Sequence, residues 1–383
     1  MKSKKKVLVL RAAPIYSDPR VTKEVKALYE ENYDISILYW ERYDIDRTSE
    51  IGKYAKIIPI RISAPMGGGI KNIFSFLKWQ IELYKKIVQL SPDIIHACDL
   101  DTGLAASLAV KKVKARFVYD IFDFYADRKA KLPEFLRKQI RKWELKVIER
   151  ADGVIICDEY RKKQIEGAKY ALLEVIYNTP EDMVGLKDSV EVEKLRKKLG
   201  DYKLIISYTG GLYPIRDVVG FAEFVAKKND YAFLIAGTGP DRKKIEDIAL
   251  RHKNIVYFGN VPYRRALEIE AASDLIVALY DPSVPNNKFS SPNKLFEAMM
   301  LGIPVIVSKG TSMDKLVKDI GNGMVVPYKD YVETENALIR FEDVKLREEL
   351  GRNGREAYEK KYSWDSMKRR LIELYKSITM QRK

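Results

Sequence analysis

A lysine and a glutamate stand three positions apart in the segment 290–308, Lys294 and Glu297. Pro292 precedes them and suits the first turn of a helix, where a missing N–H leaves no hydrogen bond unmade. Good helix formers follow as far as Gly302, which ends the helix. A helix N-terminus attracts anions, and a carboxylate accepts hydrogen bonds from ribose hydroxyls, so the segment predicts a nucleotide site. An ordinary helix with one chance glutamate is the alternative.

Glycines follow two predicted strands in the same half of the chain. Gly210 and Gly211 come directly after one strand, with Arg216 at the start of the next helix, and Gly237 and Gly239 follow another strand. A glycine lets the backbone approach a phosphate closely, and the arginine adds positive charge. We therefore expect these residues beside the same nucleotide. A tight strand–helix turn explains Gly237 and Gly239 equally well.

Polar residues follow two predicted strands in the N-terminal half. Asp99, Asp101 and Thr102 come after one strand, and Asp120 and Asp123 lie at the end of the next. Open parallel sheets bind ligands at the carboxyl ends of their strands, so we expect these side chains to face a ligand. The Asp-x-Asp spacing also allows two carboxylates to share a divalent ion, which keeps a metal site as an alternative.

The chain has 383 residues, of which 46% are hydrophobic and 32% charged, enough for two globular domains with their own cores. Its cysteines, Cys98 and Cys157, lie far apart without metal-like spacing, which fits a reducing compartment. Only four apolar residues follow the basic start, too few for a signal peptide. No run approaches the roughly 20 apolar residues of a membrane span. We expect a cytoplasmic protein.

Predicted strands and helices alternate twice along the chain, with a polar break at 180–202. This order predicts an α/β fold with two Rossmann-like domains, at 1–180 and 203–360, and a last helix in 361–383. The stretch 70–90 is predicted to be a core helix, with docking to a membrane surface as the alternative. Its predicted apolar stripe consists of Ile73, Phe76, Leu77, Ile81, Tyr84, Ile87 and Val88. Short apolar runs of the buried parallel type mark the strands. They are 5–10, 34–39, 57–62, 93–98, 117–122, 153–157 and 175–177, then 203–209, 232–236, 256–259, 274–279, 303–307 and 324–327.

Positive charge is concentrated in the N-terminal half. The net charge is +15, and residues 111–146 hold 12 Lys and Arg against 5 Asp and Glu. Such an excess suits nucleic acid, anionic lipid or a phosphorylated substrate. The segment 131–150 is both basic and amphipathic, with an apolar face predicted from Leu132, Phe135, Leu136, Ile140, Trp143 and Val147. Either a solvated surface helix or a helix that docks on an anionic membrane explains it, which would place the protein at the inner face of the membrane.

Four stretches resemble the retaining glycosyltransferases of family 4. Residues 291–306 fit the family's donor-binding signature in the variant S-P-x-K-L-F-E-x-M-x-x-G-x-P-V-I. Residues 11–24 are similar to R-x-x-P-x-x-x-D-P-R-V-x-K-E, residues 96–102 to H-x-x-D-L-D-T, and residues 208–216 to Y-x-G-x-L-x-x-x-R. The resemblance implies the GT-B fold, in which two Rossmann-like domains face a cleft and the C-terminal helix crosses back to the N-terminal domain.

The resemblance also implies an activity. A nucleoside-diphosphate sugar would be the donor, a glycan or lipid-linked molecule the acceptor, and no metal or other cofactor would be required. Arg216 and Lys294 would hold the donor diphosphate, and Glu297 the ribose, as the catalytic residues. The implied donor-binding residues are Gly210, Gly211, Gly237, Gly239, Val261, Ser291, Pro292, Asn293, Leu295 and Phe296. Those on the acceptor side are Tyr16, Arg20, Asp99, Asp101, Thr102, Asp120 and Asp123.

The chain departs from the family pattern at three places. Phe289 stands eight positions before Glu297, where many relatives have a first glutamate that contacts the transferred sugar. The loop 291–294 would then contact the sugar instead. Phe122 stands where relatives have a histidine near the donor sugar. The first loop lacks the Gly-Gly pair that binds the diphosphate, which leaves Arg20 as the substitute.

Three other classes of protein compete with this interpretation. A sugar-nucleotide epimerase of the same fold would turn over its substrate without an acceptor. A nucleic-acid-binding protein would use the positive charge, but the basic residues lack interleaved exposed aromatics, and we expect no nucleic-acid partner. An NAD enzyme needs G-x-G-x-x-G after its first strand, and the triple glycine at 67–69 follows no strand directly.

Overall fold

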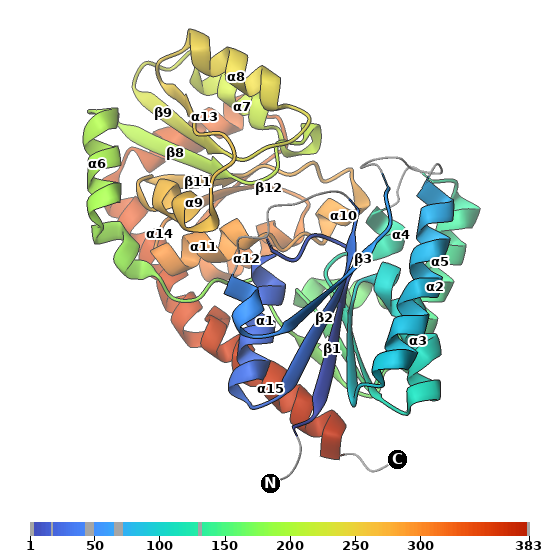
Figure 1. Ribbon diagram of the computed structural model, residues 1–383. Helices are drawn as coiled ribbons and strands as arrows, with labels where there is room; N and C mark the ends of the chain where they lie inside the picture. Colours follow the sequence, from blue (N-terminus) through green and yellow to red (C-terminus); the bar gives the residue numbers. More distant parts are fainter. Residues whose placement is uncertain (1–3, 17, 43–49, 65–71, 129–131, 381–383) are drawn as a thin grey trace. The chain divides into compact units, whose positions relative to one another are not determined.

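The computed structural model divides the chain into two compact units (Figure 1). The N-terminal unit consists of residues 1–177 and 367–383, and the C-terminal unit of residues 178–366. The predicted glycine turn at 67–69 lies outside the described residues. The structure describes residues 4–16, 18–42, 50–64, 72–128 and 132–380.

Parallel strands form the sheet of the N-terminal unit, in the order β3-β2-β1-β4-β5-β6-β7. Both faces of such a sheet are covered, which is why β1 reads as a continuous apolar run and buries Val7 through Leu10. The strand order reverses between β1 and β4, and ligands of open α/β sheets bind beside the carboxyl ends at such a switch point. The strands are β1 Lys6–Arg11, β2 Asp34–Glu41, β3 Lys56–Arg61, β4 Ile94–Cys98, β5 Arg116–Ile121, β6 Gly153–Ile156 and β7 Leu173–Val175.

Helices cover both faces of this sheet. Helices α1 and α15 lie on one face, and α2, α3 and α5 lie on the other (Figure 1). The elements are α1 Pro19–Glu30, η1 Glu50–Lys53, α2 Ile73–Leu90, α3 Leu100–Val113, α4 Tyr125–Arg128, α5 Glu134–Arg150, η3 Glu159–Lys163 and α15 Trp364–Met380.

The last helix, α15, returns to the N-terminal unit from Met367 onward. It packs closely on β6, because an added Cβ at Gly153 would lie only 2.9 Å from the Leu374 side chain. Farther into the unit, the Tyr375 hydroxyl forms a hydrogen bond of 2.7 Å with His96 Nδ1. The predicted return of the C-terminal helix is therefore confirmed.

A second parallel sheet forms the C-terminal unit, in the order β10-β9-β8-β11-β12-β13. Its switch point lies between β8 and β11. The strands are β8 Leu204–Thr209, β9 Tyr231–Ala236, β10 Ile255–Tyr257, β11 Leu275–Ala278, β12 Val305–Ser308 and β13 Gly323–Val326. Around them lie η4 Val184–Asp188, α6 Val190–Leu199, η5 Pro214–Arg216, α7 Val218–Val225, α8 Arg242–Arg251, α9 Tyr263–Ala271, α10 Pro285–Lys288, α11 Asn293–Leu301, α12 Ser312–Ile320, α13 Tyr331–Phe341, α14 Val344–Ala357 and η6 Tyr358–Tyr362. Both sheets confirm the predicted α/β fold with two Rossmann-like domains.

The prediction that α2 is a core helix was right about the helix and wrong about its buried face. The helix buries Trp79, Leu83 and Ile87. Much of the predicted stripe, including Leu77 and Ile81, is exposed instead.

The second amphipathic helix, α5, differs from its predicted orientation in the same way. It buries Glu144, Val147 and Ile148. Phe135 and Trp143, which the pattern placed on the apolar face, are exposed.

Gly237, at the end of β9, has no room for a side chain. Its φ is +137°, a conformation open to glycine alone, and an added Cβ would lie 1.8 Å from the Gly210 carbonyl oxygen. We expect Gly237→Ala to cost about 3 kcal/mol of stability. Calorimetry should show a Tm lower by about 6 to 12 °C, since each kcal/mol lowers the Tm of a unit this size by roughly 2–4 °C. Gly185→Ala, at a position with open space around it, is the matched control. Equal Tm values for the two variants would contradict the close approach of the two loops.

Candidate functional site

The switch point of the C-terminal unit brings two cations together. Lys294 lies in the first turn of α11 and is 5% exposed, and its Nζ lies 3.9 Å from the centre of the Tyr208 ring. Arg216 Cζ lies 3.7 Å from the centre of the Tyr280 ring, and the same ring is 5.5 Å from Lys294 Nζ. Aromatic faces attract cations and hold the two basic groups at the carboxyl ends of β8 and β11. Within the described residues, Lys294 makes no ion pair with a carboxylate.

Backbone groups surround this ammonium group. An added Cβ at Gly210 would lie 3.5 Å from Lys294 Nζ, so the glycine loop after β8 passes directly beside it. The helix α11 has no side-chain cap, and its first N–H groups point toward the same end. The Ser291 hydroxyl is buried and has no hydrogen-bond partner within the described part of the chain. Amide groups, a hydroxyl and two cations together are the groups that could hold an anion.

Two buried carboxylates lie behind the cations. Glu297 is 4% exposed and accepts a hydrogen bond of 2.8 Å from the Tyr263 hydroxyl. Glu270, on α9, is fully buried and accepts a hydrogen bond from the Thr209 hydroxyl at the end of β8. The sequence analysis missed Glu270. It follows Leu267 by three positions, so it lies on the same side of its helix as a core residue, and a carboxylate there was the available signal.

Burial shifts the pKa values of this group. Burial and then the Arg216 charge lower the pKa of Lys294 to about 7, against the opposing effect of the two glutamates. Burial and then the Glu297 charge raise the pKa of Glu270 well above its usual range. An anion that replaced the missing counter-ion would raise the pKa of Lys294 and restore its charge.

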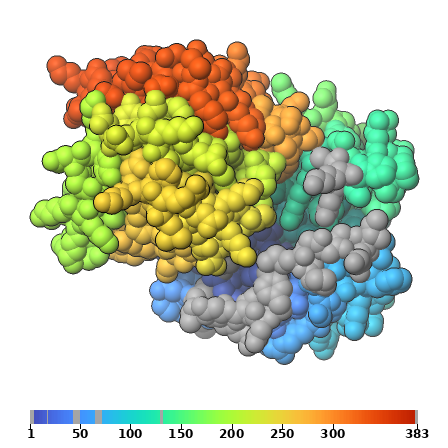
Figure 2. Space-filling view, turned by 90° about the horizontal axis from the view of Figure 1, so that it is seen from above, coloured from blue at the N-terminus to red at the C-terminus, as the bar shows by residue number. Residues whose placement is uncertain are grey.

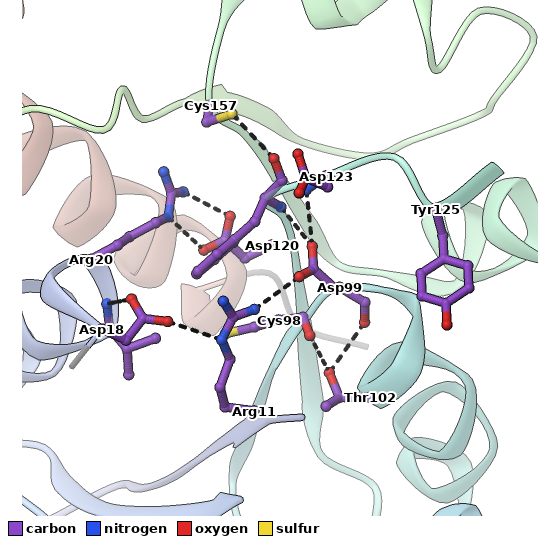
Figure 3. A network of polar contacts seen from close by, with 12 residues as sticks. Arg11, Asp18, Arg20, Cys98, Asp99, Thr102, Asp120, Asp123, Tyr125 and Cys157 are labelled. Carbon is purple, nitrogen blue, oxygen red and sulfur yellow. Dashed lines mark hydrogen bonds and ion pairs between the residues drawn. The ribbon is translucent and has the colours of Figure 1, made fainter. Parts of the chain in front are cut away.

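The switch point of the N-terminal unit holds a second polar cluster (Figure 3). Arg11, at the end of β1, pairs with Asp99 at 2.8 Å and with Asp18 at 3.0 Å. Asp99 also accepts hydrogen bonds from the backbone N–H groups of Phe122 at 2.9 Å and Asp123 at 3.1 Å. The backbone of Asp99 has φ +65° and ψ 169°, a conformation that costs a non-glycine residue about 1–3 kcal/mol. The bonds to its carboxylate hold this strained turn in place.

Arg20 lies deeper and is only 6% exposed. Its guanidinium pairs with Asp120 at 2.7 Å and Glu24 at 3.0 Å, and donates a hydrogen bond of 2.8 Å to the Ile176 carbonyl. Burial alone would raise the pKa of Asp120, but the Arg20 charge and His96 hold it below its usual range. Burial raises the pKa of Glu24 to about 7. The guanidinium of Arg20 therefore donates its hydrogen bonds to groups inside the unit. This placement suits a structural role better than contact with a substrate.

A group with metal-ligand spacing also lies here. His96, Cys98 and Asp120 hold their ligand atoms within 4.8 Å of one another, and all three are buried. Asp120 is already paired with Arg20, and burial raises the pKa of the Cys98 thiol well above its usual value. A metal ion bound here would have to displace the pair between Arg20 and Asp120 and deprotonate the Cys98 thiol.

Two family models match the chain. Residues 20–179 match the model described as Glycosyltransferase Family 4, and residues 204–343 match Glycosyl transferases group 1. The chain belongs to family 4 of the glycosyltransferases.

Individual relatives agree with this assignment. The glycosyltransferase is 27% identical over 252 residues to the Bacillus subtilis (strain 168) glycosyltransferase TuaH, an overlap of 63% of this chain and 60% of the relative. It is 24% identical over 383 residues to the Escherichia coli UDP-Gal:alpha-D-GlcNAc-diphosphoundecaprenol alpha-1,3-galactosyltransferase, with 92% of each chain covered. The structure of sucrose-phosphate synthase (tll1590) from Thermosynechococcus elongatus has a TM-score of 0.80 at 16% identity, covering 98% of this chain and 99% of that one. This likeness shows the GT-B fold.

The donor-side residues predicted for this glycosyltransferase fall into three groups. Lys294, Glu297 and Arg216 lie close together at the switch point, beside the glycine loop that follows β8. Leu295 and Phe296 are buried in the core, where they hold α11 in place. The remaining predicted positions are half-buried or buried, at loops or, for Asn293, at the start of α11: Gly211, Gly237, Gly239, Val261, Ser291, Pro292 and Asn293.

The residues predicted for the acceptor side differ in their exposure and in their contacts. Tyr16 stacks edge-on against Tyr39, with ring centres 6.0 Å apart, and the Asp123 carboxylate is 36% exposed beside Arg161. The Thr102 hydroxyl donates a hydrogen bond of 2.7 Å to the Cys98 carbonyl, and Asp101 is 9% exposed. Among these predicted residues, Tyr16 and Asp123 are therefore more accessible than the side chains of the buried network.

Removing the Arg20 guanidinium would leave two buried carboxylates without their cation. We expect Arg20→Met to cost about 3 kcal/mol or more of stability, because an uncompensated buried charge is strongly destabilising. Chemical denaturation followed by circular dichroism measures the loss. Lys85→Met, which breaks an exposed pair with Glu82, is the control and should cost less than about 1 kcal/mol. An equally small cost for Arg20→Met would mean that the arginine serves binding rather than stability.

Proposed function

We propose that this protein is a retaining glycosyltransferase that moves a sugar from a nucleoside-diphosphate sugar to a glycan or lipid-linked acceptor. The observation that carries the proposal is Lys294, a buried ammonium group without a carboxylate partner in the described residues, at an uncapped helix N-terminus. A buried cation is stable only if a counter-charge completes its site. A diphosphate supplies that charge, and Arg216 and the Gly210 loop provide further donors for it.

The donor would fill the site from the phosphates outward. Glu297, held by the Tyr263 hydroxyl, would accept hydrogen bonds from the ribose hydroxyls. The backbone at Gly237, Gly239 and Val261 would line the nucleotide. The loop 291–294 would contact the transferred sugar, with the Ser291 hydroxyl as its buried polar group.

The chemistry needs no nucleophilic side chain. The bond between the anomeric carbon and the diphosphate oxygen breaks, and the charge that develops on that oxygen is stabilised by Lys294 and Arg216. The acceptor hydroxyl attacks on the same face, so that the anomeric configuration is retained. Its proton passes to a phosphate oxygen of the leaving group. In this proposal the two basic side chains neutralise the diphosphate, and the reaction requires no cofactor.

The acceptor would meet the N-terminal unit near Asp99 and Asp123. One relative acts, by its name, on a sugar diphosphate linked to undecaprenol, which supports a lipid-linked acceptor. We place the reaction in the cytoplasm, where nucleotide sugars are available, with the basic segment 131–150 close to an anionic membrane surface.

A thermal-shift panel of UDP, GDP and ADP sugars with and without EDTA tests the donor. One nucleotide class should raise the Tm, because a ligand at about 100 times its Kd adds about 2.7 kcal/mol of stability. The shift should persist in EDTA and should be lost in Glu297→Ala. It should remain in Glu333→Ala, which removes an exposed glutamate of α13 in the same unit. No shift from any nucleotide would overturn the proposal, and turnover without an acceptor would indicate an epimerase.

Nucleotide affinity should depend on pH through Lys294. Its pKa of about 7 in the free protein means that the ammonium is charged below pH 7 and neutral above it. Diphosphate binding requires the charge, so above pH 7 the Kd should rise by up to about tenfold per pH unit. Lys294→Arg, which stays charged, should remove this dependence when titrations are followed by calorimetry.

Turnover provides the second readout for the same residue. Lys294→Met should lower kcat at least about 100-fold, equivalent to roughly 2.7 kcal/mol of transition-state stabilisation. Lys309→Met, at an exposed lysine of the same unit, is the control. A flat pH profile in the wild type together with near-normal turnover in Lys294→Met would remove Lys294 from the site.

A further inference from the structure

The helix α2 exposes apolar side chains on the side turned away from its core contacts. Phe74 is 81% exposed, Ile81 55%, Leu77 52% and Ile73 50%. At 100° per residue these four lie within an arc of about 100°, well apart from the buried Trp79 side. A helix that faced only water would place polar residues there. Scattered apolar residues are common on surfaces, but four on one helix face form a patch.

The neighbouring helices of the same layer also expose apolar side chains. Helix α3 packs against both α2 and α5, so the three form one layer over the sheet (Figure 1). Leu108 of α3 is 60% exposed, and Phe135 and Trp143 of α5 are 69% and 45% exposed. Figure 2 shows α2 in light blue and α5 in blue-green, both at the surface. We call the outer side of these helices the α2–α3–α5 face.

This face is basic as well as apolar. Its helices carry eleven Lys and Arg and five Asp and Glu, and two of the acidic residues, Asp101 and Glu144, are buried. Exposed lysines flank the apolar side chains on every helix of the layer. They are Lys78 and Lys85 on α2, Lys111 and Lys112 on α3, and Lys138, Lys142 and Lys146 on α5.

The combination of apolar and basic residues indicates which kind of partner could bind to this face. A second copy of the chain would bring the same positive charge and be repelled. Nucleic acid would satisfy the lysines but not the aliphatic side chains of α2. An anionic lipid surface satisfies both, because its headgroups pair with lysine and its acyl boundary accepts Phe, Leu, Ile and Trp. None of the described helices is long and apolar enough to cross a bilayer.

The position of the apolar residues within the helices adds a geometric reason. A helix that follows a parallel strand begins at the carboxyl edge of the sheet. Phe74 and Phe135 both lie in the first turn of their helices, hence at that edge. Asp99 and Asp123 follow β4 and β5 at the same edge. Lipid contact through these aromatic rings would bring the acceptor side of the unit to the headgroup layer.

We propose that the α2–α3–α5 face docks this protein on an anionic bilayer, with α2 lying in the interface and its apolar side chains inserted. The inference deepens the proposed function, because such docking would present a lipid-linked acceptor to the N-terminal unit. It differs from the prediction for 131–150 in assigning the inserted surface to α2 and the electrostatic attraction mainly to α5.

Vesicle flotation of the full chain tests the proposal. The probes are vesicles of phosphatidylcholine alone and of equal parts phosphatidylcholine and phosphatidylglycerol. The wild type should float with the anionic vesicles at low salt and less at high salt, because screening weakens the attraction. Phe74→Ser with Leu77→Ser should lower the partition at least about tenfold. Leu250→Ser, at a residue of α8 that is 86% exposed, should leave it unchanged.

The two parts of the face can be separated. Changing Lys138, Lys142 and Lys146 to Gln should abolish the preference for anionic over neutral vesicles. Quenching of Trp143 fluorescence by brominated lipid should report contact, and Trp143→Phe should remove the quenched component. Absence of flotation at low salt, or equal flotation of the wild type and the α2 variant, would overturn the proposal.

Nucleotide binding distinguishes this failure from failure of the proposed function. The α2 variant should keep the Tm and the nucleotide-induced thermal shift of the wild type, because the changed residues are exposed in the other unit. Flotation without a nucleotide shift would leave the docking face in place and remove the transferase. A nucleotide-induced thermal shift without flotation would keep the proposed transferase and reject the docking face.

Discussion

A positive charge buried at the start of α11 is the constraint on which the C-terminal unit depends. Lys294 is only 5% exposed, and aromatic rings replace only part of the water that a surface lysine would have. The surrounding groups reflect this deficit: Arg216 repels the ammonium, while Glu270 and Glu297 lie near enough to oppose its loss of charge. The site is therefore electrostatically incomplete, and an anionic ligand would restore the balance. Part of the binding free energy then comes from relieving the unfavourable burial of the Lys294 charge in the free protein.

The N-terminal unit handles buried charge in the opposite way. Arg20, Asp120 and Glu24 satisfy one another, and His96 links them to Tyr375 of the last helix. The charges of that network are paired within the unit. The strained turn at Asp99 sits beside it, at the edge where a substrate would arrive. One switch point thus supplies rigidity, and the other supplies unsatisfied charge.

The sequence predicted both sheets well because buried parallel strands are continuous apolar runs between turns. It also predicted that Lys294 and Arg216 lie beside one ligand, from a helix start and from glycines after a strand, and both lie near the Tyr280 ring. It could not tell which apolar side of α2 faces the sheet, because Trp79, Leu83 and Ile87 repeat with the same period as Ile73, Leu77 and Ile81. The partner of Arg20 was equally hidden, since Asp120 lies 100 positions away. Glu270 was missed for a related reason, because its role depends on Thr209, which lies 61 positions away in the sequence.

The return of α15 to the N-terminal unit bears on how the protein is made. His96 and Tyr375 are separated by 279 positions, and an entire second unit lies between them. During synthesis the C-terminal unit has emerged in full before the final turns of α15 leave the ribosome. The sheet of the N-terminal unit emerges first but receives its covering helix α15 last. Until then the surface of β6 stays uncovered. A released chain that ended before Met367 would leave that surface open to chaperones, whereas it would contain every residue of the unit at 178–366.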